Sequence, residues 1–184
     1  AAENQGLPTQ IPHDERYDIA DEFLDVCYKL WEGSWEDGAV VKDRERGIYA
    51  DPSKVHPIGH KGKYFSVPGI SLTEPSPQRT PVIFQAGASS RGQKFSGKHA
   101  EAVFISALRP DLTRVVTDRI RAAAEEQGRS RDDVKILAML SVIVDETEEK
   151  AKAKYEDYKK YINLDSAQTI LGGWSGVDLS QFDE

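Results

Sequence analysis

The sequence lacks long apolar runs, a secretory signal and paired cysteines. No window approaches the roughly 18 uninterrupted apolar residues that indicate a transmembrane helix, so no membrane span is predicted. No basic start followed by an apolar stretch marks a secretory signal. Cys27 is the only cysteine and cannot form a disulfide within the chain, which fits a reducing, cytoplasmic location.

Methionine is also scarce. Met139 is the only one, so the sequence does not begin at a translation start. We therefore expect a segment of a longer protein.

Positive charge is the third shortage. The chain has 24 Lys and Arg against 31 Asp and Glu, a net charge of −7. A nucleic-acid partner requires a basic face, so none is expected. The 184 residues, 39% of them apolar, are enough for a core, and we expect residues 1–184 to form a single domain.

From Pro81 onward, apolar strands alternate with helices. We expect strands at 81–85, 102–106 and 135–144 and a helix at 111–127, followed by a helix that Asp145 and Glu148 begin with capping-box spacing. Continuous apolar strands joined by helices indicate parallel strands, so the fold class is α/β. A complete eight-stranded barrel needs roughly 250 residues, so this pattern fits either a small open sheet or part of a barrel.

Residues 36–80 form an insertion between these strands and an earlier helix, which we expect from near Asp14 to Gly33. The insertion is rich in proline and glycine, and its KYFSV run favours a hairpin strand. A connection of this length is either functional, shaping or covering a substrate pocket, or an ordinary surface insertion. Its histidines, His56 and His60, have no cysteine or carboxylate cluster beside them, so we expect solvated side chains and no metal site.

The stretch QAGASSRGQKF (85–95) follows the first of these strands. Small residues after a parallel strand let backbone N–H groups approach a phosphate, the next helix adds partial positive charge, and Arg91 would add a full charge. Gln93 replaces the lysine of a P-loop, and Ser89 breaks the dinucleotide glycine pattern. A tight turn without a ligand is the alternative.

Several strings resemble one family. They are PHDERYDIADEFLDVCYKLWEGSW (12–35), HKGKYFSVPG (60–69), EPSPQRTPVIFQAGASSRGQKFSGKHAEAVFI (74–105) and LGGWSGVDLSQFDE (171–184). They are similar to the bacterial-luciferase-like flavin monooxygenases, in the branch of nitrilotriacetate and dibenzothiophene-sulfone monooxygenases. The resemblance implies an internal segment of a (β/α)8 TIM barrel that binds FMN, with the long loop and hairpin insertion.

The resemblance also assigns candidate cofactor-binding residues. It implies that Gly87, Ala88, Ser89 and Ser90 contact the flavin phosphate. A second implied stretch contains His13, Arg16 and Tyr17. His13 and Tyr17 are four apart and lie near each other at a helix start, where both can donate to a phosphate oxygen. Alternatively, His13 only flanks the helix cap and Arg16 pairs with a surface carboxylate.

For the intact protein, the resemblance implies a two-component monooxygenase. Reduced FMN would come from a flavin reductase, and O2 would oxygenate a small organic substrate next to nitrogen or sulfur. No catalytic residue is evident in this chain, and the substrate cannot be named. We also expect a homo-oligomer, because a partial barrel exposes sheet edges. The alternatives are a deazaflavin-dependent oxidoreductase of the same superfamily and a catalytically incomplete flavin-binding or structural fragment.

Overall fold

The computed structural model describes residues 2–87, 89–106 and 109–175. The chain divides into two compact units, Ala1–Met139 and Leu140–Glu184. The expectation of a single domain over residues 1–184 stays a prediction. No helix in the described ranges is long and apolar enough to cross a membrane.

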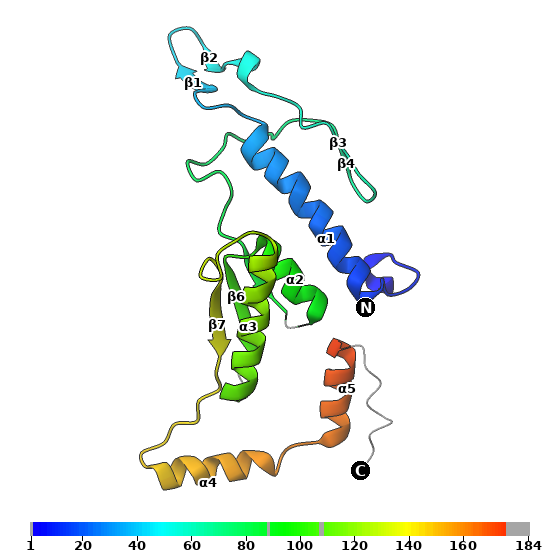
Figure 1. Ribbon diagram of the computed structural model, residues 1–184, viewed down its shortest axis with the longest axis vertical. Coiled ribbons are helices and arrows are strands. Elements are labelled where there is room, and N and C mark those ends of the chain that lie inside the picture. The colour runs from blue at the N-terminus through cyan, green and yellow to red at the C-terminus, as the bar shows by residue number, and fades with distance from the viewer. Residues whose placement is uncertain (1, 88, 107–108, 176–184) are drawn as a thin grey trace. The chain divides into compact units, whose positions relative to one another are not determined.

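The first unit is built on a parallel sheet of three strands in the order β5-β6-β7 (Figure 1). The strands are β5 (Phe84–Ala86), β6 (Ala102–Ser106) and β7 (Lys135–Met139). They confirm the α/β class and the predicted strand at 102–106. The third strand is shorter than predicted, because its pairing with β6 ends at Met139. Leu140 and Val142, in the apolar run beyond it, are 69% and 75% exposed.

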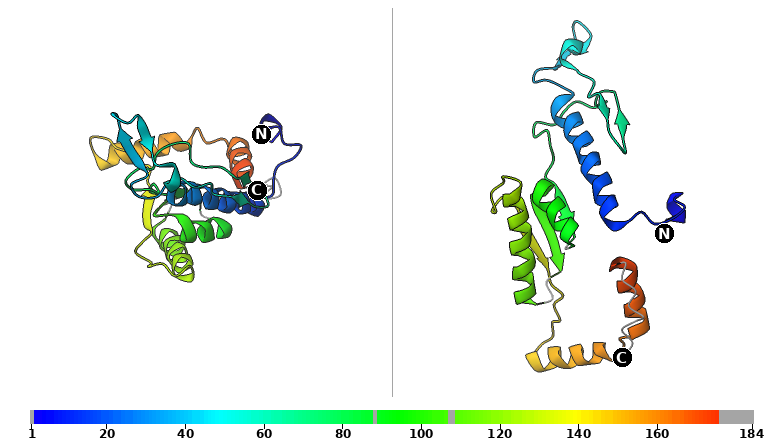
Figure 2. Two further views of the ribbon diagram at one scale, coloured as in Figure 1. Left: turned by 90° about the horizontal axis from the view of Figure 1, so that it is seen from above. Right: turned by 45° about the vertical axis from the view of Figure 1, so that its right-hand side comes forward.

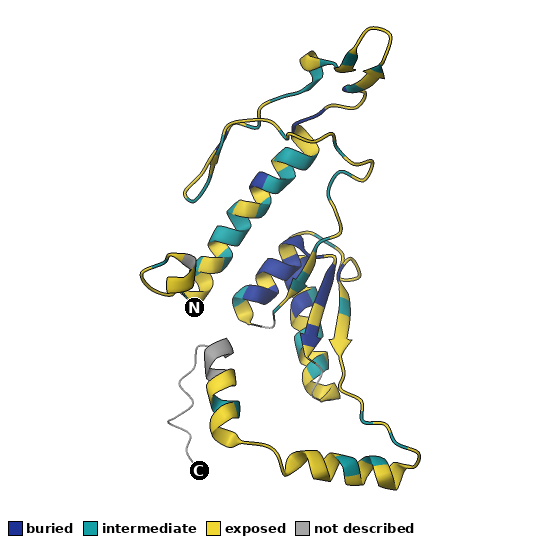
Figure 3. Cartoon of the chain, turned by 180° about the vertical axis from the view of Figure 1, so that it is seen from behind, coloured by how far each residue is buried: buried dark blue, intermediate teal, exposed yellow. Residues whose placement is uncertain are grey.

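Helices α2 (Ser90–His99) and α3 (Pro110–Glu126) connect these strands. Buried residues gather on α2 and β6 (Figure 3). The hydrophobic core consists of Ala100, Val103, Ile105, Ile120, Ala124 and Val134. The opposite face of the sheet exposes Phe84, Phe104 and Leu137. The helices therefore cover one face of the sheet and leave the other open.

A close helix crossing fixes α2 against α3. A Cβ on Gly97 would lie 2.5 Å from the backbone carbon of Ala123, so only glycine allows this approach. Arg129 then donates to the carbonyls of Gly97 and Ala100, both at 2.8 Å, and satisfies the carboxyl end of α2. The crossing places α2 rigidly on the sheet.

Helix α1 (His13–Tyr28) continues into a π-helical turn, Lys29–Gly33, close to the predicted bounds. Its apolar face is less buried than the periodicity predicts: Val26 is buried, whereas Phe23 is 53% exposed. The ring of Phe23 packs near that of Phe65 in the insertion, with 6.0 Å between centroids.

The insertion contains two antiparallel hairpins, β1 (Val40–Asp43) with β2 (Ile48–Ala50) and β3 (His60–Lys61) with β4 (Ser66–Val67). The β3–β4 hairpin runs beside α1 (Figure 2). The Glu22 carboxylate of α1 accepts the amides of Tyr64 at 2.9 Å and Phe65 at 2.7 Å. This carboxylate anchors the hairpin.

The expectation that His60 is solvated is wrong. Its side chain is 5% exposed, and Nε2 lies 3.1 Å from the Glu22 carboxylate. Lys29 Nζ lies 3.0 Å from Nδ1. The sequence could not show this because the two partners, Glu22 and Lys29, lie 38 and 31 residues away along the chain. His56, half-exposed beside Glu36, fits the expectation.

The second unit contains α4 (Glu148–Lys159) and α5 (Leu164–Ser175). Thr147, rather than Asp145, caps α4, because its side chain accepts the amide of Lys150. Asp145 instead pairs with Lys154 at 2.8 Å. The predicted helix is present, but the capping residue was misassigned.

Candidate functional site

The loop after β5 ends in a capped helix. Ser89 is the N-cap of α2: its Oγ accepts the amide of Gly92 at 3.1 Å, and its carbonyl accepts the amide of Gln93 at 2.8 Å. The Ser89 hydroxyl keeps its own proton to donate. The amides of Ser90 and Arg91 lie in the first turn, where backbone N–H groups have no acceptor within the helix. Ala88, also predicted to contact phosphate, lies outside the described residues.

Tyr17 of α1 reaches this loop. A Cβ added to Gly87 would lie 2.9 Å from the Tyr17 hydroxyl, and one added to Gly92 would lie 2.6 Å from it. Gln85 Nε2 lies 3.5 Å from the same oxygen. The two predicted stretches, which are 70 residues apart in sequence, therefore meet at the Tyr17 hydroxyl, and the two glycines make room for it.

Three neighbours hold the Tyr17 ring. The ring of Phe95 lies 5.4 Å away and that of His13 lies 5.3 Å away, between centroids. The Arg91 guanidinium carbon lies 5.5 Å from the centre of the Tyr17 ring. His13 is exposed and bonds Asp14 at 2.7 Å. His13 and Tyr17 thus lie together at the start of α1, as their spacing predicts.

Arg16 stays apart from this arrangement. Its side chain is exposed and makes no hydrogen bond or ion pair with the part of the chain that the structure describes. The alternative of a surface ion pair is therefore not seen, and a role in cofactor binding stays a prediction.

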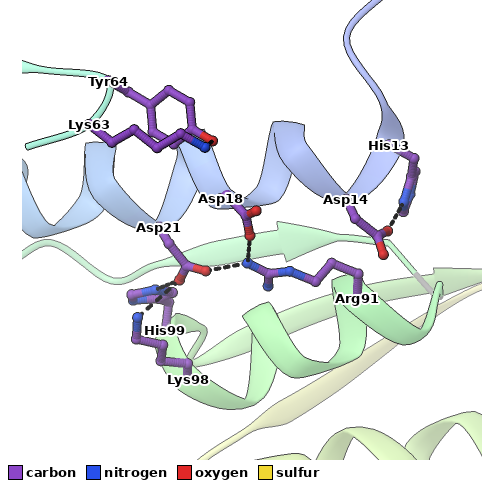
Figure 4. Close-up of polar contacts among 9 residues, drawn as sticks. All are labelled: His13, Asp14, Asp18, Asp21, Lys63, Tyr64, Arg91, Lys98 and His99. Carbon is purple, nitrogen blue, oxygen red and sulfur yellow. Dashed lines mark hydrogen bonds and ion pairs between the residues drawn. The ribbon is translucent and has the colours of Figure 1, made fainter.

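Arg91 does not offer its charge to the loop, contrary to the sequence expectation. Its Nη2 donates to Asp18 at 2.9 Å and to Asp21 at 2.5 Å, both on α1 (Figure 4). The pairing of Arg91 with these two carboxylates was not predicted from the sequence. They are three residues apart on one helix face, a spacing that can receive a single guanidinium.

Asp21 is the centre of a wider network. It also accepts from Lys98 Nζ at 3.1 Å and from His99 Nε2 at 2.7 Å. Burial alone would raise the pKa of the Asp21 carboxyl, but its hydrogen bonds outweigh that effect and hold the pKa below its usual range. Asp21 is therefore ionised at neutral pH and ties α1 to both ends of α2.

His99 completes the contact between the two helices. Burial lowers its pKa, against the opposing effect of Asp21. The neutral ring then donates from Nε2 to Asp21 and accepts at Nδ1 from the Tyr28 hydroxyl, 3.0 Å away. Burial also raises the pKa of Tyr28, which keeps its proton. His99 therefore links α1 to the end of α2.

The chain direction fixes where the insertion attaches. Helices α1 and α2 run in the same direction, since Tyr17 lies against Arg91 and Gly92 at the start of α2 and Tyr28 bonds His99 at its end. The insertion leaves the carboxyl end of α1 and enters the amino end of β5, at the opposite edge of the sheet from the loop. Whether it covers a substrate stays a prediction.

No group of three or more histidine, cysteine or acidic side chains within the described residues could hold a metal ion. The polar groups near the loop include hydroxyls, amides and the His13 imidazole, while the Arg91 guanidinium is paired with Asp18 and Asp21. This donor set suits an anion.

Successive parallel strands joined by helices, with a glycine-bounded loop after the first, define an α/β protein of the parallel βα type. Residues 1–174 match the family model of the luciferase-like monooxygenases, and the chain belongs to that family.

Named relatives support the same assignment. The chain is 52% identical over 183 residues to dimethyl-sulfide monooxygenase of Hyphomicrobium sulfonivorans, covering 100% of this chain and 38% of the relative. It is 52% identical over 182 residues to long-chain alkane monooxygenase of Geobacillus thermodenitrificans, covering 99% and 41%. Dibenzothiophene-sulfone monooxygenase of Rhodococcus erythropolis is 36% identical, with 98% and 40% covered. Nitrilotriacetate monooxygenase component A of Aminobacter aminovorans is 37% identical, with 99% and 40% covered. The predicted resemblance is confirmed.

Solved structures agree with the fold. A long-chain alkane monooxygenase superposes with a TM-score of 0.86 at 52% identity, covering 98% of this chain and 42% of that one. A riboflavin lyase with modified FMN and riboflavin superposes with a TM-score of 0.87 at 41% identity, covering 100% and 40%. The predicted fold class, part of a luciferase-like TIM barrel, is confirmed. The chain spans about 40% of the length of the relatives it matches.

Proposed function

We propose that the whole protein is an FMN-dependent monooxygenase and that this chain supplies the phosphate end of the flavin site. The observation that carries the proposal is the meeting of the Tyr17 hydroxyl with Gly87 and Gly92 at the capped start of α2. A side chain at either glycine would fill this space. The two glycines thus let the Tyr17 hydroxyl approach the start of α2, and this group of donors follows a parallel strand, which fits a phosphate group.

Each donor has a defined part in the proposal. The Tyr17 hydroxyl, the Ser89 hydroxyl and the amides of Ser90 and Arg91 would donate to phosphate oxygens. The start of α2 adds partial positive charge. His13, next to Tyr17, would add a further donor, and its exposed ring can turn toward the loop. We propose Arg16 as a peripheral charge only.

When bound, reduced FMN supplies the electrons with which O2 is activated. This chain would hold the cofactor by its phosphate and so fix where its ring lies. We propose that a separate flavin reductase supplies the reduced FMN, as expected of a two-component system. A homo-oligomer and a cytoplasmic location are part of the same proposal.

The substrate class rests on the relatives. We propose a small organic molecule oxygenated next to sulfur or nitrogen, because dimethyl-sulfide, dibenzothiophene-sulfone and nitrilotriacetate monooxygenases are among the relatives. An alkane monooxygenase is equally similar at 52% identity, so an alkane is the competing substrate class.

The test is flavin binding and oxygen use by the full-length protein. FMN and riboflavin are titrated by flavin fluorescence against wild type and a Ser89→Ala/Ser90→Ala variant. We expect micromolar FMN binding that weakens in the variant, while riboflavin binding stays the same. Substrate-dependent oxygen consumption with NADH, FMN and a flavin reductase would support the monooxygenase. Hydride transfer with a deazaflavin and no oxygen consumption would contradict it.

A further inference from the structure

Arg91 is the second residue of α2 and therefore adjoins the proposed phosphate donors. A guanidinium at such a position ordinarily suggests a phosphate ligand. In this structure the Arg91 guanidinium is instead paired with two carboxylates of α1. Asp18 and Asp21 accept from the same Nη2 at 2.9 and 2.5 Å (Figure 4). Its side chain is only 20% exposed.

The neighbouring carboxylates neutralise the positive charge that Arg91 would otherwise bring to the loop. One guanidinium faces two carboxylates, and the second of them also receives Lys98 and His99. An anion at the loop would meet a cation already neutralised by its neighbours. Binding would then depend on uncharged donors and on the helix start.

The same pairing fixes the geometry of those donors. Arg91 lies over the Tyr17 ring, 5.5 Å from its centre, and donates to Asp18, the next residue of α1, and to Asp21, one turn beyond Tyr17. It thereby joins the first turn of α2 to the segment of α1 that carries the Tyr17 hydroxyl. Loss of this link would let the hydroxyl move away from Gly87 and Gly92.

We propose that the Arg91 side chain positions the phosphate site: held by Asp18 and Asp21, it keeps the Tyr17 hydroxyl over the start of α2, and its guanidinium does not itself bind the phosphate. This inference rests on the proposed FMN function. It predicts a phosphate site formed mainly by neutral donors, with the Arg91 side chain used as a structural link.

Replacing the two carboxylates should change FMN affinity in opposite directions, depending on whether Arg91 positions Tyr17 or binds the phosphate. Arg91→Met should weaken FMN binding under either role. Asp18→Ala/Asp21→Ala should also weaken it, by about tenfold, if Arg91 positions Tyr17, because the link is cut. If Arg91 binds phosphate, the same double variant should tighten FMN binding, because it frees a positive charge.

The experiment measures FMN and riboflavin affinity for the full-length protein by fluorescence titration. The expected result is a loss of FMN affinity in both variants and little further loss when they are combined, since both cut the link between Arg91 and α1. Riboflavin, which lacks the phosphate, should bind all variants as it binds wild type. Tighter FMN binding by the carboxylate variant would overturn the proposal.

Lys98→Met is the matched control. It removes another ion pair of Asp21, at 3.1 Å, but at the far end of α2 from the loop. FMN affinity should be unchanged. If it falls as far as in Arg91→Met, or if every variant loses riboflavin and FMN alike, the network is only structural and the proposal is wrong.

Two safeguards keep the outcomes distinct. If the double variant fails to fold, as judged by thermal melting, Asp18→Ala alone removes one exposed partner of Arg91 and gives the same sign test. Absence of FMN binding by the unmutated full-length protein would refute the proposed function itself.

Discussion

Replacing Gly92 with alanine should damage cofactor binding without damaging the fold. The new Cβ would lie 2.6 Å from the Tyr17 hydroxyl and 3.0 Å from Ser89 Oγ. Ordinary contact begins at 3.4 Å, so the Tyr17 hydroxyl must retreat by the difference, about 0.8 Å. The displaced atom is the end of a side chain, so the backbone can stay in place.

The substitution Gly92→Ala should affect folding stability and FMN affinity differently. Alanine gains up to about 1 kcal/mol over glycine in a helix, which offsets the cost of moving Tyr17. A displaced hydroxyl loses a hydrogen bond to a charged phosphate, which contributes roughly 1.5–3 kcal/mol. We therefore expect nearly unchanged unfolding in urea and FMN binding weaker by about 10- to 100-fold, with riboflavin binding unaffected.

Tyr17→Phe provides the internal check. It removes the hydroxyl that the new Cβ meets, so Gly92→Ala should cause little further loss of FMN affinity in that background. Gly33→Ala is the matched control, because nothing lies within 4 Å of its added Cβ. Wild-type FMN affinity in Gly92→Ala, or an equal further loss in the Tyr17→Phe background, would refute this account of the site.

Three further predictions concern the supports of the site. Gly97→Ala places a Cβ against the backbone of Ala123, which cannot retreat, and should destabilise the protein by about 1–3 kcal/mol in urea unfolding, whereas an unchanged midpoint would contradict the close crossing. Glu22→Ala removes the acceptor of two hairpin amides and should speed tryptic cleavage in the β3–β4 hairpin; an unchanged cleavage rate would show that other contacts hold it. Burial lowers the pKa of His99 from its ordinary 6.5, so the unfolded chain binds the proton more readily and stability should fall as pH drops below that value. His99→Gln should flatten this pH dependence of urea unfolding, and an unaltered slope would assign it to other groups.

Local sequence signals predicted the elements well where apolar runs and helix periods are clear. The strand at 102–106 was predicted with its observed bounds, and the helix at 111–127 was predicted to within one residue at each end. The strand predicted at 135–144 ends at Met139, where its partner strand also ends. Apolar composition alone does not show whether a neighbouring strand continues. The cap of α4 failed because two acceptors, Asp145 and Thr147, precede the same helix and only geometry distinguishes them.

The site was predictable only in part. Helical spacing placed His13 beside Tyr17, and the family resemblance linked both to the loop at Gly87. Nothing in the sequence showed that Arg91 pairs with Asp18 and Asp21, because those contacts join segments about 70 residues apart. A charged residue near an anion loop is therefore a weak indicator of a ligand until its partners are known.

Two buried histidines, His60 and His99, connect α1 to the insertion and to α2. Asp21 and Glu22 are adjacent, yet successive residues of a helix face different directions. Asp21 accepts from His99 of α2, whereas Glu22 accepts from His60 of the insertion. Each carboxylate thus fixes one neighbour against the helix that carries Tyr17. The insertion contacts α1 through Glu22, so α1 links it to the proposed phosphate site.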